Sequence, residues 1–173
     1  MMKTPLLCLM LAMTLPCCSG CGYMLGSPQV QGVRTVHVPI FKSESFRRNL
    51  DYLLTEAVQS EIKNRTAYRL DGPETADTIL KGRIVEFRKT PLSETSFDDS
   101  RELQLLIGAE VTWVDRRTGT ILLQHVFPIG PELAQQASQV SFAPEVGHSL
   151  ATAQQESAQQ LAAQIVDLLE APW

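Results

Sequence analysis

The stretch ELQLLIGAEVTW, residues 102–113, alternates between apolar and polar side chains along most of its length. Successive residues of a β-strand point to opposite faces of the sheet, so this pattern predicts a strand with one covered face and one polar face. Such alternation is typical of an antiparallel sheet that packs against a second layer on one side only. The apolar positions are Leu103, Leu105, Ile107, Ala109, Val111 and Trp113, and the polar ones include Glu102, Gln104, Glu110 and Thr112.

The segment after this strand predicts its partner in a hairpin. Residues 115–119 read DRRTG, and Gly119 can supply the left-handed backbone that a tight turn needs. Residues 120–127 then predict a return strand. The side chains expected on one side of that strand are Ile121, Leu123 and Phe127.

The segments upstream predict further strands. Residues 76–90 are rich in Ile, Leu, Val and Phe, but their apolar positions change phase, and a bulge near Gly82 would reconcile the two phases. The polar residues 91–100 predict a loop. Shorter strands are expected at 67–70 and at 33–41. In the latter, the residues expected on one face are Val36, Val38 and Ile40.

Two segments have apolar residues at helical spacing. Residues 45–64 predict an amphipathic helix, which the hydroxyls and carboxylate of Ser43-Glu44-Ser45 would cap. Residues 149–170 predict a second long helix, ended by Pro172 and with a glutamine-rich polar face. Between the return strand and this helix, three prolines predict an irregular connection with a short helical turn at 132–138.

These elements predict an α+β fold. A mixed sheet of four to five strands with one apolar face needs a cover, and two amphipathic helices can provide it as a two-layer α/β sandwich. Residues 33–173 are long enough for one such domain with a real core.

The N-terminus predicts export and lipidation. Lys3 is followed by a mostly apolar run of about 11 residues and then by small residues, which is typical of a signal peptide and short for a transmembrane helix. Ser19-Gly20 before Cys21 resembles a lipobox, so we expect a signal peptide over 1–20, a covalent lipid on Cys21 and a tether over 21–32. Cys18 is the alternative lipid site, and an ordinary cleaved signal that yields a soluble secreted protein is the alternative to lipidation.

The net charge and the positions of the cysteines limit the possible partners and cross-links of the mature chain. The formal net charge is −4, or −5 without Lys3, which argues against a nucleic-acid partner but allows a local anion site. Cys8, Cys17 and Cys18 lie in the expected signal peptide, so no disulfide is expected in the mature chain.

Catalytic and metal motifs are missing from the sequence. The histidines lie far apart, and there is no nucleophile elbow or phosphate loop, so we expect neither an enzyme, a metal site nor a cofactor. An acidic cluster could bind a cation, but a solvated loop explains it better; its members are Glu94, Asp98, Asp99 and Glu102.

Basic residues are the more suggestive group. Arginine and lysine are the side chains that bind phosphate, arginine in a bidentate way. Five of them fall on or beside two neighbouring strands, where an ordinary exposed strand face is the alternative interpretation. They are Arg83, Arg88, Lys89, Arg116 and Arg117.

Several short motifs together resemble the LptE family of lipopolysaccharide-assembly lipoproteins. They read CGY at 21–23, VHVPIF at 36–41, LDYLLTEA at 50–57 and ADTILKGRI at 76–84, and the turn at 115–119 and the order of elements agree as well. Where the family often has Asn-x-Thr, this chain has Ser43-Glu44-Ser45, a difference that bears on partner contacts.

The resemblance implies an outer-membrane lipoprotein, lipid-anchored at the periplasmic face. Such a protein would plug a large β-barrel, LptD, help it assemble and help deliver lipopolysaccharide to the cell surface. The five basic residues would then be candidate lipopolysaccharide contacts. Activation of a peptidoglycan synthase or service to another envelope complex is the alternative, and an enzyme acting on envelope material is a more remote one.

Overall fold

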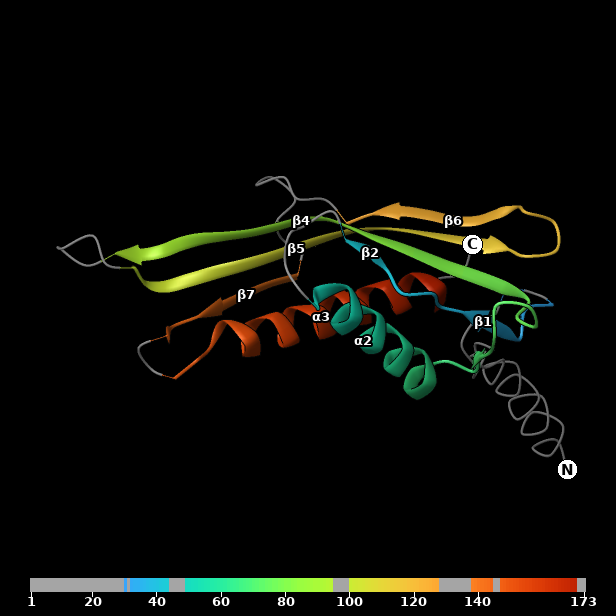
Figure 1. Ribbon diagram of the computed structural model, residues 1–173, viewed down its shortest axis with the longest axis horizontal. Coiled ribbons are helices and arrows are strands. Elements are labelled where there is room, and N and C mark those ends of the chain that lie inside the picture. The colour runs from blue at the N-terminus through green and yellow to red at the C-terminus, as the bar shows by residue number, and fades with distance from the viewer. Residues whose placement is uncertain are drawn as a thin grey trace, which may run out of the picture.

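A long antiparallel hairpin forms the centre of the structure, a computed structural model (Figure 1). Strand β4 (Thr78–Glu94) pairs with β5 (Ser100–Asp115) from end to end. The structure describes residues 30, 32–43, 49–94, 100–127, 138–144 and 147–170. The expected signal peptide, Cys21, Asp98, Asp99 and Pro172 lie outside these residues.

Within the described residues, five shorter strands extend this hairpin into a mixed sheet of seven strands, which is more than the four to five expected. On the β4 side, the strands run parallel: β1 pairs with β3 and β4, and β2 pairs with β4. On the β5 side, β6 and β7 run antiparallel and occupy opposite ends of the same edge. Their bounds are Thr35–His37 for β1, Lys42–Ser43 for β2, Arg69–Leu70 for β3, Ile121–Val126 for β6 and Ser138–Phe142 for β7.

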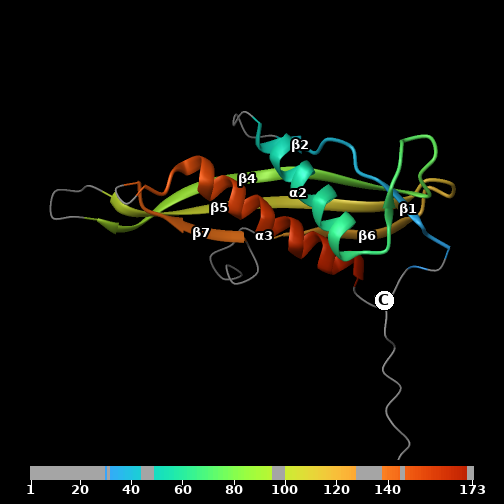
Figure 2. The ribbon, with the colours of Figure 1, turned by 90° about the horizontal axis from the view of Figure 1, so that it is seen from below.

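Both described helices, α2 (Leu50–Arg65) and α3 (Leu150–Glu170), lie on the same side of the sheet (Figures 1 and 2). The expected α+β sandwich with two helices over one face is therefore confirmed. Among the described helices, none is long and apolar enough to cross a membrane.

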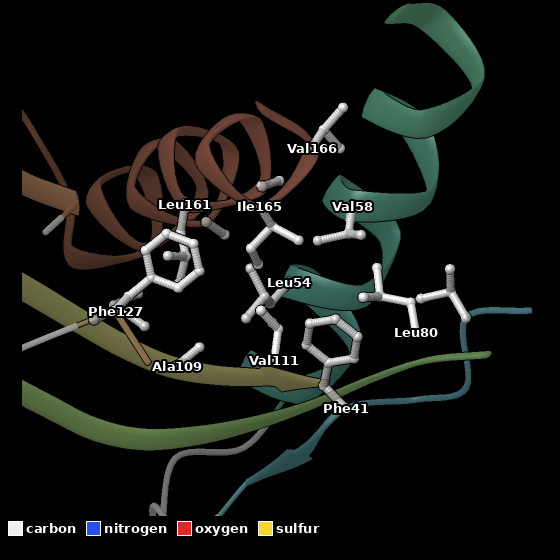
Figure 3. Close-up of a cluster of buried hydrophobic side chains, with 14 of the residues drawn as sticks. Phe41, Leu54, Val58, Leu80, Ala109, Val111, Phe127, Leu161, Ile165 and Val166 are labelled. Atoms are coloured by element: carbon white, nitrogen blue, oxygen red, sulfur yellow. The ribbon is translucent and has the colours of Figure 1, made fainter. Parts of the chain in front are cut away.

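The core lies between the helices and the sheet, as the alternation of residues 102–113 predicts. From β5, every second side chain from Leu105 to Trp113 is buried, whereas Glu110 and Thr112 face the other way. Figure 3 shows Leu54 and Val58 of α2 and Ile165 of α3 pointing into the same space as Val111. Burial of these aliphatic side chains, at roughly 1.5–3 kcal/mol each, is the main contribution that holds the two layers together.

The first expected strand divides into β1 and β2, and Ile40 does not face the core as predicted. Val36 pairs with Thr78 but Lys42 pairs with Arg83, so six steps along the first segment match five along β4. One extra residue reverses which side chains point inward. Phe41 is consequently buried, with 1% of its surface exposed, and Ile40 is 53% exposed.

The same effect corrects the expectation for Ile121. Trp113 pairs with Leu123, but the next residue, Val114, pairs with Ile121, so Leu122 is the extra residue. Leu123 remains buried as predicted, and Ile121 is 55% exposed.

The phase change in β4 is a bulge, as expected, but at a different place. Pairing is regular at Gly82, which lies opposite Val111, and the register shifts between Ile84 and Glu86. The expected loop over 91–100 is shorter than predicted, because β4 continues to Glu94 and β5 begins at Ser100.

Two further local predictions were wrong. Ser43 belongs to β2 and does not cap a helix; α2 begins at Leu50, after Asn49 in a left-handed backbone conformation. The connection after β6 contains strand β7 where irregular structure was expected, while 132–137 lies outside the described residues. By contrast, α3 begins within one residue of the predicted start and runs to Glu170.

Candidate functional site

A hollow of about 430 Å³ lies on the face of the sheet that the helices do not cover, where β2, β4 and β5 meet. We call it the β2–β4–β5 hollow. It combines cationic, apolar and polar groups. Its lining residues are Pro39, Ile40, Lys42, Lys81, Gly82, Arg83, Glu110 and Thr112.

The absence of a side chain at Gly82 allows the segment before β2 to lie close against β4. A Cβ atom at this position would lie 2.4 Å from two atoms of the Phe41 ring, which is far too close for any real contact. The Phe41 ring therefore occupies the space that another residue in β4 would fill. This close approach brings the segment carrying Ile40 and Lys42 against the edge of β4.

A hydrogen bond to α2 holds the same segment from the helix side of the sheet. The backbone N–H of Phe41 donates to the hydroxyl of Thr55 at 2.9 Å, and that hydroxyl donates to the carbonyl of Asp51 at 2.6 Å. Because Phe41 and Thr55 are both buried, neither group has water as an alternative partner. The covered face of the sheet thus positions residues that line the uncovered face.

Three cationic side chains meet at the hollow. Lys42 lies directly beside Arg83 in the parallel register of β2 and β4, and Lys81 lies two residues before Arg83 on the same face. Neighbouring strands are about 5 Å apart, and alternate residues of one strand are roughly 7 Å apart. Like charges at these separations repel one another.

Among the described lining residues, one carboxylate balances part of this charge. Glu110, opposite Arg83 on β5, accepts a hydrogen bond from the Arg83 guanidinium at 2.6 Å and another from the Gln124 amide at 3.1 Å. The first contact and then the second hold the pKa of the Glu110 carboxyl below its usual value. Within the described residues, neither Lys42 nor Lys81 has a carboxylate partner within ion-pair distance.

The structure does not bring the five sequence-predicted basic residues together. Arg88 lies on the same face as Arg83 but roughly 15 Å further along β4, and it pairs with Glu86 at 2.6 Å. Lys89 lies opposite buried Leu105 and so points toward the helix side of the sheet. Of the five, Arg83 alone lines the hollow.

Arg116 and Arg117 lie at the other end of β4 and β5, in the hairpin turn. Arg116 donates from its backbone to the carbonyl of Asp77 at 2.9 Å and from Nε to the carbonyl of Ala76 at 2.7 Å. These contacts join the turn to the start of β4. The pKa of the Asp115 carboxyl is lowered, chiefly by the backbone N–H of Thr118 and further by that of Arg117 and its charge.

Sequence reasoning missed Lys42 and Lys81. Lys81 and Arg83 share a face because they are two residues apart on one strand, and this signal was readable from the alternation of β4. The place of Lys42 beside Arg83 could not be read from the sequence, because it depends on the parallel pairing of two segments far apart in the chain.

A second hollow of about 520 Å³ lies between α2 and α3, and its charge is opposite. It is lined by two carboxylates and several amides, with no cationic side chain among the described lining residues. They are Leu53, Glu56, Ala57, Ser60, Glu61, Asn64, Gln155 and Gln159. An anionic ligand would therefore be repelled here and attracted to the β2–β4–β5 hollow.

Metal-binding residues do not gather in the described ranges. No group of three His, Cys, Asp or Glu side chains there could hold a metal ion. His37 contacts the carbonyl of Asp71 at 3.1 Å, His125 packs edge-on against Phe127, and His148 precedes α3.

Comparison with known proteins gives one family and a set of similar folds. The family described as LptE, lipopolysaccharide-assembly, matches residues 33–169. The chain matches no curated protein.

Solved structures with a similar fold share little sequence with this chain. The PelC dodecamer from Paraburkholderia phytofirmans gives a TM-score of 0.53 at 12% identity, covering 86% of this chain and 95% of that chain. The hypothetical protein CT253 from Chlamydia trachomatis gives 0.55 at 12%, covering 80% and 96%. Protein XCC0632 from Xanthomonas campestris gives 0.51 at 11%, covering 81% and 84%. At these identities the likeness concerns the fold alone.

Proposed function

The chain belongs to the LptE family of lipopolysaccharide-assembly proteins, and we propose from this premise that it is a plug and assembly factor for the LptD β-barrel. The observation that carries the proposal is the extent of the family match. Residues 33–169 include all seven strands that the structure describes, the whole of α2 and all but the last residue of α3. The family is one of assembly and not of catalysis, so the protein is not an enzyme.

The polarity of both outer surfaces supports a place inside a water-lined barrel. On the uncovered face of the sheet, charged and polar side chains such as Lys81, Arg83 and Gln124 are exposed or half-buried. On the opposite side, the outer faces of α2 and α3 carry exposed residues such as Glu56 and Gln159. A two-layer domain whose two outer faces are both polar can fill a hydrated lumen, because both faces can remain in contact with water.

Anchoring at the outer membrane completes the proposal. A lipid on Cys21 would hold the protein at the periplasmic face, and the tether over 21–32 would let the domain reach roughly 40 Å from it. Gly22, rather than an aspartate, after the lipidated cysteine is compatible with outer-membrane sorting. In this position the domain would assist the transport of lipopolysaccharide to the cell surface. Its exposed basic residues could bind the phosphate groups of the lipopolysaccharide.

The test is the identity of the protein's partner. The protein, purified from membranes in mild detergent, is expected to bring with it a large outer-membrane β-barrel, identified by mass spectrometry. The Cys21→Ala variant serves as the control and is expected to leave the membrane fraction. Recovery of a cell-wall synthase in place of any barrel would overturn the proposal.

A further inference from the structure

We propose that this protein associates with itself, and that the β2–β4–β5 hollow of one copy binds the hollow between α2 and α3 of the next. We call the latter the α2–α3 hollow. The inference goes beyond the proposed function and does not depend on it. It concerns copies outside a barrel, since inside a lumen the barrel wall would take the place of the neighbouring copy.

Opposite charge is the first argument. The β2–β4–β5 hollow has three cationic side chains and Glu110, which leaves two net positive charges. The α2–α3 hollow has Glu56 and Glu61 and no cation among its described lining residues, which leaves two negative charges. Surfaces of opposite sign attract and orient approaching proteins, and like charges brought together repel. The pattern therefore favours contact between unlike hollows over contact between two like ones.

The charged groups of both hollows are available to a neighbouring copy. Lys42, Lys81 and Glu56 are exposed, and none of them has an ion-pair partner within the described residues. Glu61 has a long contact of 3.8 Å with Arg65, whose guanidinium also contacts two carboxylates of α3. New ion pairs with a second copy would thus replace few contacts within one copy.

The spacing of the charges agrees as well. Lys42 lies beside Arg83, two residues from Lys81 on the neighbouring strand, so the Cα atoms of the two lysines are about 8 Å apart. Glu56 and Glu61 both belong to α2, and helix geometry places their Cα atoms about 8–9 Å apart. The two lysines of one copy can therefore reach the two glutamates of the next at the same time.

The two hollows lie back to back across the core. On α2, Ala57 lines one hollow, and the next residue, Val58, points into the same core space as Val111 of β5 (Figure 3). On either side of Val111, Glu110 and Thr112 line the other hollow. A second copy displaced along the line through both hollows consequently places unlike hollows in contact.

Apolar side chains add to the contact. Ile40, which the extra residue between β1 and β2 turns outward, is 53% exposed and lines the β2–β4–β5 hollow with Pro39. Leu53 and Ala57, both partly buried, line the α2–α3 hollow. Contact between the hollows would remove Ile40 from water, and an apolar centre within a polar rim is typical of protein interfaces.

Such a contact uses a different surface on each of the two copies. Heterologous contacts of this kind generate rings or open stacks, because the end copies keep one hollow unoccupied until the assembly closes. We therefore expect assemblies larger than a dimer at high protein concentration, and dissociation when salt screens the charges.

The experiment measures the mass of the purified full-length protein by sedimentation velocity in density-matched detergent, over a range of protein concentrations. We expect association in about 0.05 M salt, weakened about tenfold in about 0.5 M salt. Two variants each reverse the charge of one hollow: Lys42→Glu/Lys81→Glu makes the sheet side acidic, and Glu56→Lys/Glu61→Lys makes the helix side basic. Each variant should associate with itself about tenfold more weakly than the unaltered protein, since its two hollows then carry like charges.

A mixture of the two variants is the decisive measurement. The acidic sheet side of the first variant meets the basic helix side of the second, and the two unaltered hollows still attract each other. The mixture should therefore regain about the association of the unaltered protein. A loss caused by misfolding would not be regained on mixing.

Lys63→Glu/Lys89→Glu is the matched control for net charge. Both lysines are exposed, and neither lines one of the two hollows. This variant should associate as the unaltered protein does. Far-ultraviolet circular dichroism of each variant establishes that the fold is retained.

Two outcomes would overturn the inference. An unaltered protein that is monomeric at every concentration would exclude self-association and leave the hollows to partners of another kind. A mixture that associates no more tightly than either variant alone would exclude the pairing of these two hollows. Because these measurements use no barrel, a failure to recover a barrel from membranes would affect the proposed function alone.

Discussion

At the scale of single residues, the contact between Gly82 and Phe41 decides where the uncovered face of the sheet carries its charges. The ring lies where a Cβ atom of residue 82 would be. Its burial turns Ile40 outward and brings Lys42 beside Arg83. One glycine thus links the packing of the core to the chemistry of the opposite surface.

Gly82→Ala should therefore destabilise the protein more than an ordinary glycine replacement. The new methyl group must displace the Phe41 ring, and such overpacking costs about 1–3 kcal/mol. The measurement is the free energy of unfolding in urea. Gly72→Ala is the control, because its Cβ would meet only the Thr75 hydroxyl at an ordinary 3.5 Å. Phe41→Leu combined with Gly82→Ala should cost less than the sum of the single changes, and simple additivity would contradict the contact.

Asp77, the residue before β4, joins that end of the strand to Arg34 and to Thr35 at the start of β1. Its carboxylate accepts hydrogen bonds from the N–H of Arg34 at 3.0 Å and from the N–H and hydroxyl of Thr35 at 3.1 and 3.0 Å. These contacts, that of Arg34 first, lower the pKa of the Asp77 carboxyl below its ordinary value. The folded state consequently favours the ionised form.

A lowered pKa in the folded state makes stability depend on pH in a defined direction. The contribution of Asp77 is fully present above the pKa of an unfolded aspartate, about 3.9, and is lost as the pH falls through the lower folded value. Asp77→Asn should be less stable than the unaltered protein at pH 7 and should lose less stability between pH 5 and pH 3. Urea unfolding at these pH values checks this, and an unchanged slope in the variant would contradict it.

At the scale of elements, a cluster around Arg65 joins the C-terminal ends of the two helices. The Arg65 guanidinium contacts the carboxylates of Asp167 and Glu170 on α3, the latter at 3.3 Å, and that of Glu61 one turn earlier on α2 at 3.8 Å. The hydrogen bond to Asp167 and the neighbouring acidic charges raise the pKa of Arg65, against the opposing effect of its partial burial. Its side chain is 37% exposed, so water and salt weaken these contacts.

Arg65→Gln should lower the free energy of unfolding by about 0.5–1 kcal/mol at low ionic strength. In about 1 M salt the difference should narrow, because screening already weakens the contacts in the unaltered protein. Lys63→Gln, which removes one positive charge from the same helix, is the control and should lower the free energy of unfolding by less. A loss for Arg65→Gln that is independent of salt would show that packing of its stem and not charge is responsible.

Elements with their own periodicity could be predicted from the sequence, and elements that depend on distant partners could not. The alternation in residues 102–113 and the helical spacing in α3 are local, and both predictions were confirmed. Strand β7 follows a proline-rich connection, and it pairs with Leu103–Ile107 of β5, some 35 residues earlier in the chain. Nothing local distinguishes those five residues from a loop.

The same distinction holds for the candidate site. That arginines of β4 lie on a polar face could be predicted from parity, and Arg83 does line the hollow. The exposure of Ile40 and the position of Lys42 could not be predicted. They depend on a single extra residue between β1 and β2, which reverses the side chains that face the core and cannot be recognised from the sequence.

At the scale of the whole molecule, one apolar interior separates two outer sides whose hollows differ in charge. The helix side carries a hollow with Glu56 and Glu61, and the sheet side carries one with Lys42, Lys81 and Arg83. An anionic ligand is therefore expected to be attracted to the hollow on the sheet side and repelled by the hollow on the helix side.

The proposed role in lipopolysaccharide delivery is tested by depletion of the protein in the cells that make it, followed by labelling of new lipopolysaccharide. New lipopolysaccharide should stop reaching the cell surface and should accumulate on the inner side of the envelope. Restoring the unaltered protein should reverse this, whereas restoring Cys21→Ala should do so poorly. Normal delivery of lipopolysaccharide in depleted cells, together with a defect in the cell wall, would rule out this role.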